Sequence, residues 1–371
     1  MLAFLKDLFR PSRHRRGPAR KPYPERPELQ SLEDRQLLSV SVARYGLGPE
    51  VFAVGKQDGQ VYAQKLDSGG NPVGGTFLTT PGAVKTISAV NLRGAVPTLF
   101  AVGLDDQVYE QQFDANGSSL GGYRLAAPGQ VKTINLPPQG VAPELFVIGL
   151  DEQVYAVPFD TQGNAKGGYS LTTPGQVKAI SVGTYNNSFQ AEVFAIGLDD
   201  QVYAQKFDAN GRSVTPYFLT RPGAVKTLTA AFDFNGAVDT PEVFVIGLDD
   251  QVYAQKFDRN GNSASSYFLT RPGQVKALAV DSTSADSNPE LFVIGLDDQV
   301  YAQKVDNRGN SITGYVLTRP GQVKALTVGY DNTGIQEFFA IGLDDRVYGQ
   351  TLDAQGNPTS SYYLALNQQV V

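Results

Sequence analysis

The chain has 371 residues, of which 41% are hydrophobic and 18% charged, so it can bury a substantial core. It contains no cysteine and no tryptophan, and its single histidine, His14, lies near the N-terminus. These counts exclude disulfides, thiolate nucleophiles and cysteine-ligated metals, and they exclude a Ser-His-Asp triad or a multi-histidine zinc site in the body of the chain. We therefore expect the protein to use no cofactor and no metal ion.

The first 30 residues differ from the rest of the chain in charge. They hold eight Lys and Arg against three Asp and Glu, a net charge of +5, whereas the remainder holds 23 basic and 34 acidic residues, a net charge of −11. We expect 1–30 to be a disordered basic leader with a short amphipathic helix, at most, over Leu2–Phe9. The acidic body argues against a nucleic-acid partner. No apolar run reaches the length of an ordinary signal peptide core or a transmembrane segment.

A short motif follows the leader. Ser31–Ser39, SLEDRQLLS, resembles the N-terminal LEPR/LEDR motif of planctomycete-type exported and surface proteins. The resemblance implies export, with the motif standing immediately before the first strand. The alternative is a basic linker in which Glu33, Asp34 and Arg35 form a solvated charged cluster. The predicted organisation is a leader over 1–30, a motif or linker over 31–36, and one domain over 37–371.

Seven near-copies of one unit make up that domain. The segment VFAVG recurs at intervals of 48, 46, 48, 50, 48 and 47 residues, and 241–256 differs from 289–304 at one position in sixteen. The final glycines of the copies are Gly55, Gly103, Gly149, Gly197, Gly247, Gly295 and Gly342. A repeat of nearly constant length indicates seven equivalent structural modules.

Each unit divides into four short strand patterns, as residues 275–318 illustrate. ELFVIGLD (290–297) is almost continuously apolar, as in a central strand covered on both faces. The strand patterns VKALAV (275–280) and QVYAQKVD (299–306) precede and follow it. Asp306 and Gly309 frame a type I turn signature that every copy keeps. No segment of the repeats has the period of a helix. The pattern predicts an all-β fold, a seven-bladed β-propeller with four antiparallel strands per blade.

The two ends of the repeat region determine the predicted closure. The last unit ends at SYYLALNQQVV with no VKALAV segment after it, and QLLSVSVARYG (36–46) aligns with QVKALTVGYD (322–331). We therefore expect Leu37–Ala43, as an N-terminal strand, to complete the seventh blade. That pairing would close the ring and remove two open sheet edges.

The strand pair PEVFAVGKQDGQVYAQK (49–65) and its copies resemble the blades of bacterial seven-bladed lectins of the fucose-binding type. Those blades share an apolar EVF strand, a glycine, an Asp-containing turn and a strand with an aromatic residue. The resemblance implies shallow glycan pockets between adjacent blades and no catalysis. The chain departs from it by lacking the Trp that stacks on sugars. The aromatic position holds Tyr62, Tyr109, Tyr155, Tyr203, Tyr253, Tyr301 and Tyr348. The alternative role for these tyrosines is packing between blades.

Strand direction places the LDDQ turns and the TRPGQ connections on the same rim of the propeller. In copies four to six, each connection carries an Arg with a Lys five residues later, and acidic turns lie nearby. Guanidinium groups suit carboxylate, sulfate or vicinal hydroxyls, and carboxylates accept hydrogen bonds from sugar hydroxyls. The predicted ligand-binding residues are Arg221, Lys226, Asp249, Arg271, Lys276, Asp297, Arg319 and Lys324. The alternative is that these cations only neutralise neighbouring aspartates.

The paired carboxylates of the LDDQ turns also raise the question of glycoside hydrolysis. They are adjacent in tight turns and repeat around the ring, whereas catalysis needs one asymmetric constellation of acid and base. The sequence therefore favours a binding module that is not an enzyme. The function predicted is lectin-like glycan binding, and the alternative is a structural or protein-interaction surface propeller. The partners expected are an extracellular polysaccharide or a glycoprotein. The protein is expected to be a monomer, exported or at the cell surface, with a cytoplasmic location left open.

Overall fold

The structure is a computed structural model of the chain, and every residue it describes falls in the unit Leu37–Val371. The described residues are 40–45, 48–67, 69–79, 82–91, 97–114, 118–127, 129–137, 144–159, 165–166, 170–171, 176–185, 190–208, 212–216, 218–221, 223–234, 239–258, 260–265, 268–271, 274–281, 289–306, 311–313, 316–319, 322–330, 336–353 and 357–371. The predicted leader, its Leu2–Phe9 segment and the Ser31–Ser39 motif lie outside them.

The described residues form 28 strands in seven four-stranded antiparallel sheets. The first sheet contains β1 (Val40–Tyr45), β2 (Gly48–Val54), β3 (Val61–Leu66) and β4 (Pro72–Leu78). The second contains β5 (Val84–Asn91), β6 (Pro97–Gly103), β7 (Val108–Gln112) and β8 (Arg124–Ala127). The third contains β9 (Val131–Asn135), β10 (Glu144–Gly149), β11 (Val154–Pro158) and β12 (Ser170–Leu171).

The remaining four sheets follow in the same order along the chain. The fourth contains β13 (Val177–Tyr185), β14 (Gln190–Gly197), β15 (Val202–Phe207) and β16 (Phe218–Arg221). The fifth contains β17 (Val225–Phe234), β18 (Asp239–Gly247), β19 (Val252–Lys256) and β20 (Phe268–Arg271). The sixth contains β21 (Val275–Asp281), β22 (Glu290–Gly295), β23 (Val300–Lys304) and β24 (Val316–Arg319). The seventh contains β25 (Val323–Tyr330), β26 (Gln336–Gly342), β27 (Val347–Thr351) and β28 (Tyr363–Leu366).

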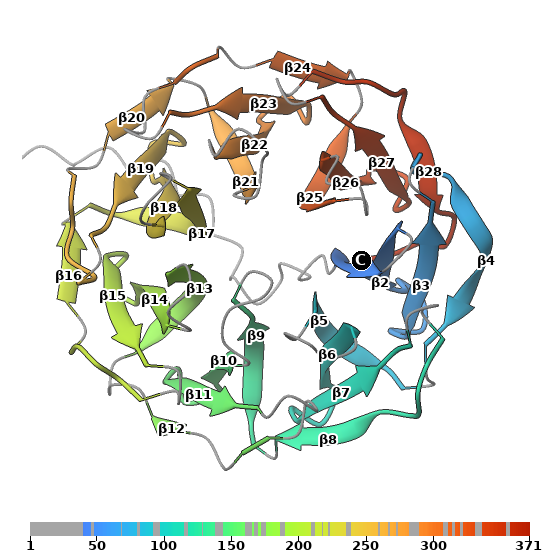
Figure 1. Cartoon of the computed structure of the whole chain (residues 1–371), viewed down its shortest axis with the longest axis horizontal. Coiled ribbons are helices and arrows are strands. Elements are labelled where there is room, and N and C mark those ends of the chain that lie inside the picture. Colours follow the sequence, from blue (N-terminus) through green and yellow to red (C-terminus); the bar gives the residue numbers. More distant parts are fainter. Residues whose placement is uncertain are drawn as a thin grey trace, which may run out of the picture. The chain divides into compact units, whose positions relative to one another are not determined.

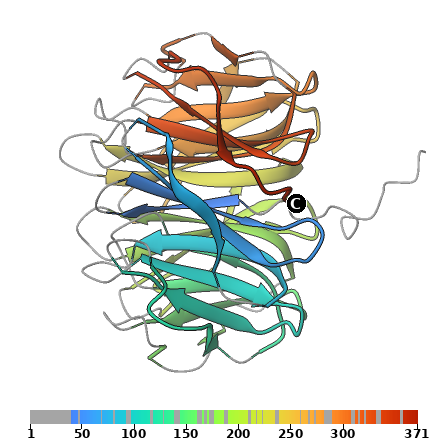
Figure 2. The ribbon, with the colours of Figure 1, turned by 90° about the vertical axis from the view of Figure 1, so that its right-hand side faces the viewer.

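The sheets of the unit Leu37–Val371 follow one another around a central axis, in the arrangement of a β-propeller (Figure 1). The first strand of each sheet contacts the first strand of the next sheet, and β25 contacts β1. The strands run between two rims that carry the turns and connections (Figure 2). The prediction of an all-β fold built from small antiparallel sheets is therefore confirmed.

The predicted role of the N-terminal strand is wrong. β1 pairs with β2 of the first sheet, from Val40 opposite Ala53 to Tyr45 opposite Gly48. The seventh sheet already has its own first strand, because β25 pairs with β26. The repeats align equally well in either phase, and the short connection between Tyr45 and Gly48 favours the local antiparallel pairing of a hairpin.

The core lies between neighbouring sheets. The second strands are buried on both faces, as every residue of β10 and β22 is, which explains their continuous apolar sequence. Phenylalanines of neighbouring sheets meet there, with ring centroids 4.7 to 5.6 Å apart. These pairs are Phe52–Phe113, Phe100–Phe159, Phe146–Phe207, Phe194–Phe257 and Phe292–Phe338. Because each sheet is apolar on the side of its neighbour, no sheet can bury its core alone.

We expect Phe194→Ala to destabilise the protein strongly. Its ring is fully buried between the fourth and fifth sheets, 4.7 Å from the ring of Phe257, so truncation leaves a cavity that costs about 3–5 kcal/mol. Leu296→Ala is the control, because Leu296 is half-exposed and its loss should cost less than about 0.5 kcal/mol. Urea unfolding followed by circular dichroism measures both. Equal free energies of unfolding for the two variants would contradict a core between the sheets.

Candidate functional site

One rim carries the turn between the second and third strands of every sheet. We call it the acidic rim, and its turns are residues 56–59, 104–106, 150–152, 198–200, 248–250, 296–298 and 343–345. The connections between sheets reach the same rim, because the backbone amide of Leu296 donates to the carbonyl of Gln274 and that of Leu343 to Gln322. The LDDQ turns and the ends of the TRPGQ connections therefore lie together, as the strand directions predict.

A tyrosine–aspartate hydrogen bond organises each of these turns. In the sixth sheet, the Tyr301 hydroxyl donates to Asp297 Oδ2 at 2.7 Å, and Asp297 Oδ1 accepts from the backbone amide of Gln299 at 3.2 Å. A Cβ added to Gly295 would lie 2.5 Å from Asp297 Oδ1 and 3.1 Å from the Tyr301 ring, so only glycine fits before the turn. The equivalent pairs are Tyr62–Asp58, Tyr109–Asp105, Tyr155–Asp151, Tyr203–Asp199, Tyr253–Asp249 and Tyr348–Asp344.

The last residue of each turn has a left-handed backbone. In the first sheet it is glycine, Gly59, with φ of 67°. The other turns place acidic residues there with φ between 63° and 66°: Asp106, Glu152, Asp200, Asp250, Asp298 and Asp345. Aspartate tolerates this region better than most residues. This conformation directs the residue's carbonyl toward the next sheet, where it accepts a backbone amide, as Asp298 O does from Val323 N at 2.9 Å.

Five of the repeated lysines pair with left-handed aspartates of these turns. Lys226 Nζ pairs with Asp250, Lys276 with Asp298 and Lys324 with Asp345, and Lys85 and Lys178 do the same with Asp106 and Asp200. Each pair joins the first strand of a sheet to that sheet's own acidic turn. The structure thus brings the predicted lysines to aspartates, but to the second aspartate of each turn.

The predicted aspartates Asp249 and Asp297 lie close enough to Lys226 and Lys276 to interact with their charges, but their hydrogen bonds are made within the turn. Asp249 and Asp297 each accept a tyrosine hydroxyl and a backbone amide within their own turn. Arg221, Arg271 and Arg319 end the outermost strands β16, β20 and β24, and their side chains lie outside what the structure describes. Lys226, Lys276 and Lys324 follow on the innermost strands of the next sheets. An Arg and the Lys five residues later are therefore at opposite edges of their sheets.

A cavity of about 360 Å³ lies on the acidic rim at the seventh sheet. Its lining residues are Gln322, Val323, Gly342, Leu343, Asp344, Tyr348 and Tyr362. The Tyr362 ring is fixed edge-on against Phe338, with centroids 5.6 Å apart. Sequence reasoning missed Tyr362, although a tyrosine precedes the fourth strand in six of the seven copies. Apolar and aromatic walls with a carboxylate and an amide at the edge suit a small, partly apolar, hydroxylated ligand.

Exposed leucines form a second repeated feature of the acidic rim. Each begins an acidic turn, and 46% to 63% of its surface is exposed. They are Leu104, Leu150, Leu198, Leu248, Leu296 and Leu343. The first sheet has Lys56 at this place instead. A large apolar residue at six equivalent exposed positions is unusual, since the turn itself uses only the backbone of this residue.

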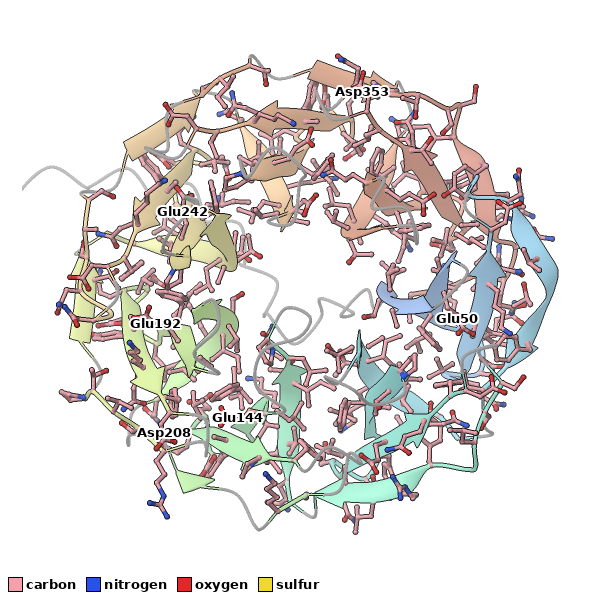
Figure 3. The ribbon with its side chains drawn as sticks, in the orientation of Figure 1. Glu50, Glu144, Glu192, Asp208, Glu242 and Asp353 are labelled. Atoms are coloured by element: carbon pink, nitrogen blue, oxygen red, sulfur yellow. The ribbon has the colours of Figure 1, made fainter. Side chains whose placement is uncertain are left out.

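The opposite rim carries a ring of buried glutamates at the start of the second strands, which sequence reasoning also missed. Six of the seven sheets have one at this position: Glu50, Glu144, Glu192, Glu242, Glu290 and Glu337, the first four of which are labelled in Figure 3. In the fourth sheet, Glu192 lies opposite Lys206 in register. Burial lowers the pKa of Lys206, while Glu192 and Asp258 of the next sheet oppose that shift. Lys206 thus lies near carboxylates of two sheets, and we assign this buried group of charges a structural role.

Among the described residues, no group of three or more His, Cys, Asp or Glu side chains is placed to hold a metal ion. The same part of the chain contains no helix that is long and apolar enough to cross a membrane.

No protein-family model matches the sequence, and no curated protein matches it. The fold is similar to the periplasmic gluconolactonase PpgL of Pseudomonas aeruginosa, with a TM-score of 0.57 and 16% identity over 88% of this chain and 98% of that one. It is also similar to human WBSCR16 (TM-score 0.52, 11% identity, 80% and 85% covered). The SapL1 lectin, solved with α-methyl fucoside, matches with a TM-score of 0.50 and 14% identity over 79% and 97%. Identities this low show a shared propeller-like fold alone.

The tyrosine–aspartate bond predicts a pH dependence. Donation by the Tyr301 hydroxyl lowers the pKa of Asp297 below its ordinary value of 3.8, against a smaller opposing effect of burial. The folded pKa is the lower one, so the bond contributes stability at pH values above 3.8, and this contribution is lost as the pH falls through the folded pKa. We expect Tyr301→Phe to raise the pKa of Asp297 toward 3.8.

Carboxyl carbon NMR titration of Asp297 in the two proteins measures this shift. Asp298 in the same turn is the internal reference, because Tyr301 donates to Asp297. An Asp297 pKa that stays the same after removal of the hydroxyl would contradict the proposed cause of the shift.

Proposed function

We propose that the chain is a closed seven-bladed propeller that binds glycans on its acidic rim and catalyses no reaction. The observation that supports this best is the cavity at the seventh sheet, where Tyr348 and Tyr362 stand beside Asp344 and Gln322. The CH face of a sugar packs on aromatic and leucine side chains, while its hydroxyls need a few fixed polar partners. A volume of about 360 Å³ accommodates a small saccharide.

The repeat multiplies this site around the rim. The sixth sheet has Gln274, Val275, Leu296, Asp297 and Tyr301 at the places of Gln322, Val323, Leu343, Asp344 and Tyr348. Each shallow site is weak, but several sites on one rim raise the avidity for a repetitive polymer by about 10²–10⁴. The ligand class we propose is therefore an extracellular polysaccharide or a densely glycosylated protein, bound by an exported or surface-located protein.

The turn geometry argues against hydrolysis at the acidic pairs. In five of the pairs, one carboxylate accepts a tyrosine hydroxyl and the other pairs with a lysine, as Asp297 and Asp298 do. Both carboxylates of such a pair are engaged within the turn, and donation by Tyr301 lowers the pKa of Asp297, whereas a glycosidase keeps one of its two carboxyls protonated as a general acid. Because the fold also resembles a gluconolactonase, lactone hydrolysis belongs in the test. We expect rates on aryl glycosides, esters and gluconolactone at buffer background.

A glycan array probed with the full chain tests the proposal, with binding expected and competed by the soluble oligosaccharide. Leu343→Arg places a bulky cation at the cavity and should weaken binding several-fold. Leu364→Arg is the matched control, since Leu364 is an exposed leucine of β28 that does not line the cavity. Equal glycan binding by the two variants would show that the ligand does not bind in this cavity. If the full chain binds no glycan on the array, the proposal of glycan binding is overturned.

The arginines of copies four to six have their own test. We expect the triple change of Arg221, Arg271 and Arg319 to Thr to reduce polysaccharide retention on an affinity gel without lowering the melting temperature, since copies one and three carry Thr at the equivalent positions. Guanidinium groups bind acidic or vicinal oxygens in a planar fork that Thr cannot replace. Unchanged retention would remove this sector from the site.

A second candidate function is protein interaction, and the six exposed leucines favour it. Such residues at equivalent places give one rim a repeated apolar character. Changing all six leucines to serine distinguishes the two functions. Protein interaction, in place of glycan binding, would be supported if the serine variant lost a defined protein partner and the unchanged protein bound no glycan on the array.

A further inference from the structure

The first strand of a sheet begins with a link to the preceding sheet. A valine amide donates to the carbonyl of the left-handed turn residue in the sheet before it, at 2.7 to 3.0 Å. The links are Val84 to Gly59, Val131 to Asp106, Val177 to Glu152, Val225 to Asp200, Val275 to Asp250 and Val323 to Asp298. The residue before the valine completes the connection, as when Gln322 O accepts the amide of Leu343.

The first sheet receives the same link from a distant part of the sequence. Val370 N donates to Asp345 O at 2.7 Å, and Gln369 O accepts the amide of Lys56 at 3.0 Å. Val370 forms an antiparallel bridge with Gly55, and Val371 N donates to Val54 O at 2.9 Å. Described pairing of β1 begins only at Val40, opposite Ala53. Two separate segments therefore share one strand position along β2.

The segment is held by its backbone and by two side chains, Val370 and the partly buried Val371, which packs on the cluster that contains Phe52. Val370 is fully buried, in a cluster with Val51, Phe339 and Leu366, while Asn367 and Gln369 are exposed. Backbone hydrogen bonds to a strand edge together with side-chain pockets are the elements of peptide recognition by β-strand addition.

The two sheets beside the segment are also joined without it. Lys56 Nζ lies 2.5 Å from Asp345 Oδ2, and Lys324 pairs with the other oxygen of the same carboxylate. Both lysines lower the pKa of Asp345. The ion pair joins the first and seventh sheets through side chains that Asn367–Val371 does not supply, so the receiving edge can persist when the segment leaves.

We propose that Asn367–Val371 is a releasable latch, and that the edge beneath it is a binding site for an extended peptide with valine at the anchor. The ligand is a polypeptide segment from another molecule, recognised by three backbone hydrogen bonds and the Val370 pocket. In the intact chain the latch competes at an effective concentration of about millimolar or more. The site is thus closed until the latch is displaced. This proposal is independent of glycan binding.

Removing residues 367–371 tests the proposal, with the fluorescent peptide ALNQQVV as the probe. We expect the shortened protein to melt at a lower temperature, to bind the peptide one to one, and to regain thermal stability with it. The full chain should bind the peptide at least about 100-fold more weakly, because its own segment competes. No binding by a folded shortened protein would overturn the proposal.

Two altered peptides distinguish specific insertion from unspecific adhesion. Proline at the place of Val370 removes the amide that bonds Asp345 O, so this peptide should not bind. Alanine at the place of Gln369 changes only an exposed side chain, so that peptide should bind as well as the original. Equal binding of the proline and alanine peptides would contradict recognition through the backbone.

A full-length variant covers the case in which the shortened protein fails to fold. Val370→Pro weakens the latch and keeps the rest of the chain, so hydrogen exchange at the Lys56 amide should accelerate. Added ALNQQVV peptide should slow it again, whereas the proline peptide should not. Exchange at Lys56 that the peptide leaves unchanged would overturn the proposal. Self-association of either variant that the peptide reverses would identify a second copy as the donor of the segment.

Discussion

The hydrogen bond from a valine amide to the carbonyl of a left-handed turn residue is the constraint on which the arrangement of the sheets depends. It joins each turn to the following sheet, as between Asp298 and Val323. The carbonyl can point to the next sheet only if the residue has positive φ. That conformation in turn needs a residue tolerant of it, which explains aspartate and Gly59 at this place. The tyrosine–aspartate bond and the preceding glycine hold the turn in this shape.

This constraint limits what the acidic rim can offer to a ligand. In five of the turns, the first carboxylate accepts a tyrosine hydroxyl and a backbone amide, and the second pairs with a lysine, as in the turn of Asp297 and Asp298. The groups that the turn itself does not require are the leucine side chain and the faces of the tyrosine rings. The chemistry left for binding is therefore largely apolar and aromatic, with polar atoms at its edge, although the composition of the rim is strongly charged.

The sequence was sufficient to predict the number of sheets, their four strands and the rim on which the acidic turns lie. These follow from period, from alternation and from turn residues, all of which are local properties. The phase of the repeat could not be predicted, because a cyclic pattern does not say which sheet a strand such as Val40–Tyr45 joins. The partners of Asp249 and Asp297 could have been found, since a tyrosine follows each by four residues. The cavity could not, because Val323, Leu343 and Tyr362 come from three separate strands or turns.

The first sheet differs from the other six at several positions of the repeat, and these differences are explained by its contacts with the seventh sheet. The first sheet alone has Lys56 where the others have leucine, and this lysine reaches Asp345 of the seventh sheet. It also has Gly59 where the others have an acidic residue, and the backbone amide of Lys56 donates to the carbonyl of Gln369 rather than to that of a residue preceding β1. A strand position filled by two segments lacks the continuous backbone that joins the other sheets, so an ion pair there adds a link that the other sheets do not need. Sequence asymmetry in this chain therefore marks the seam between its ends, and a ligand is not required to explain it.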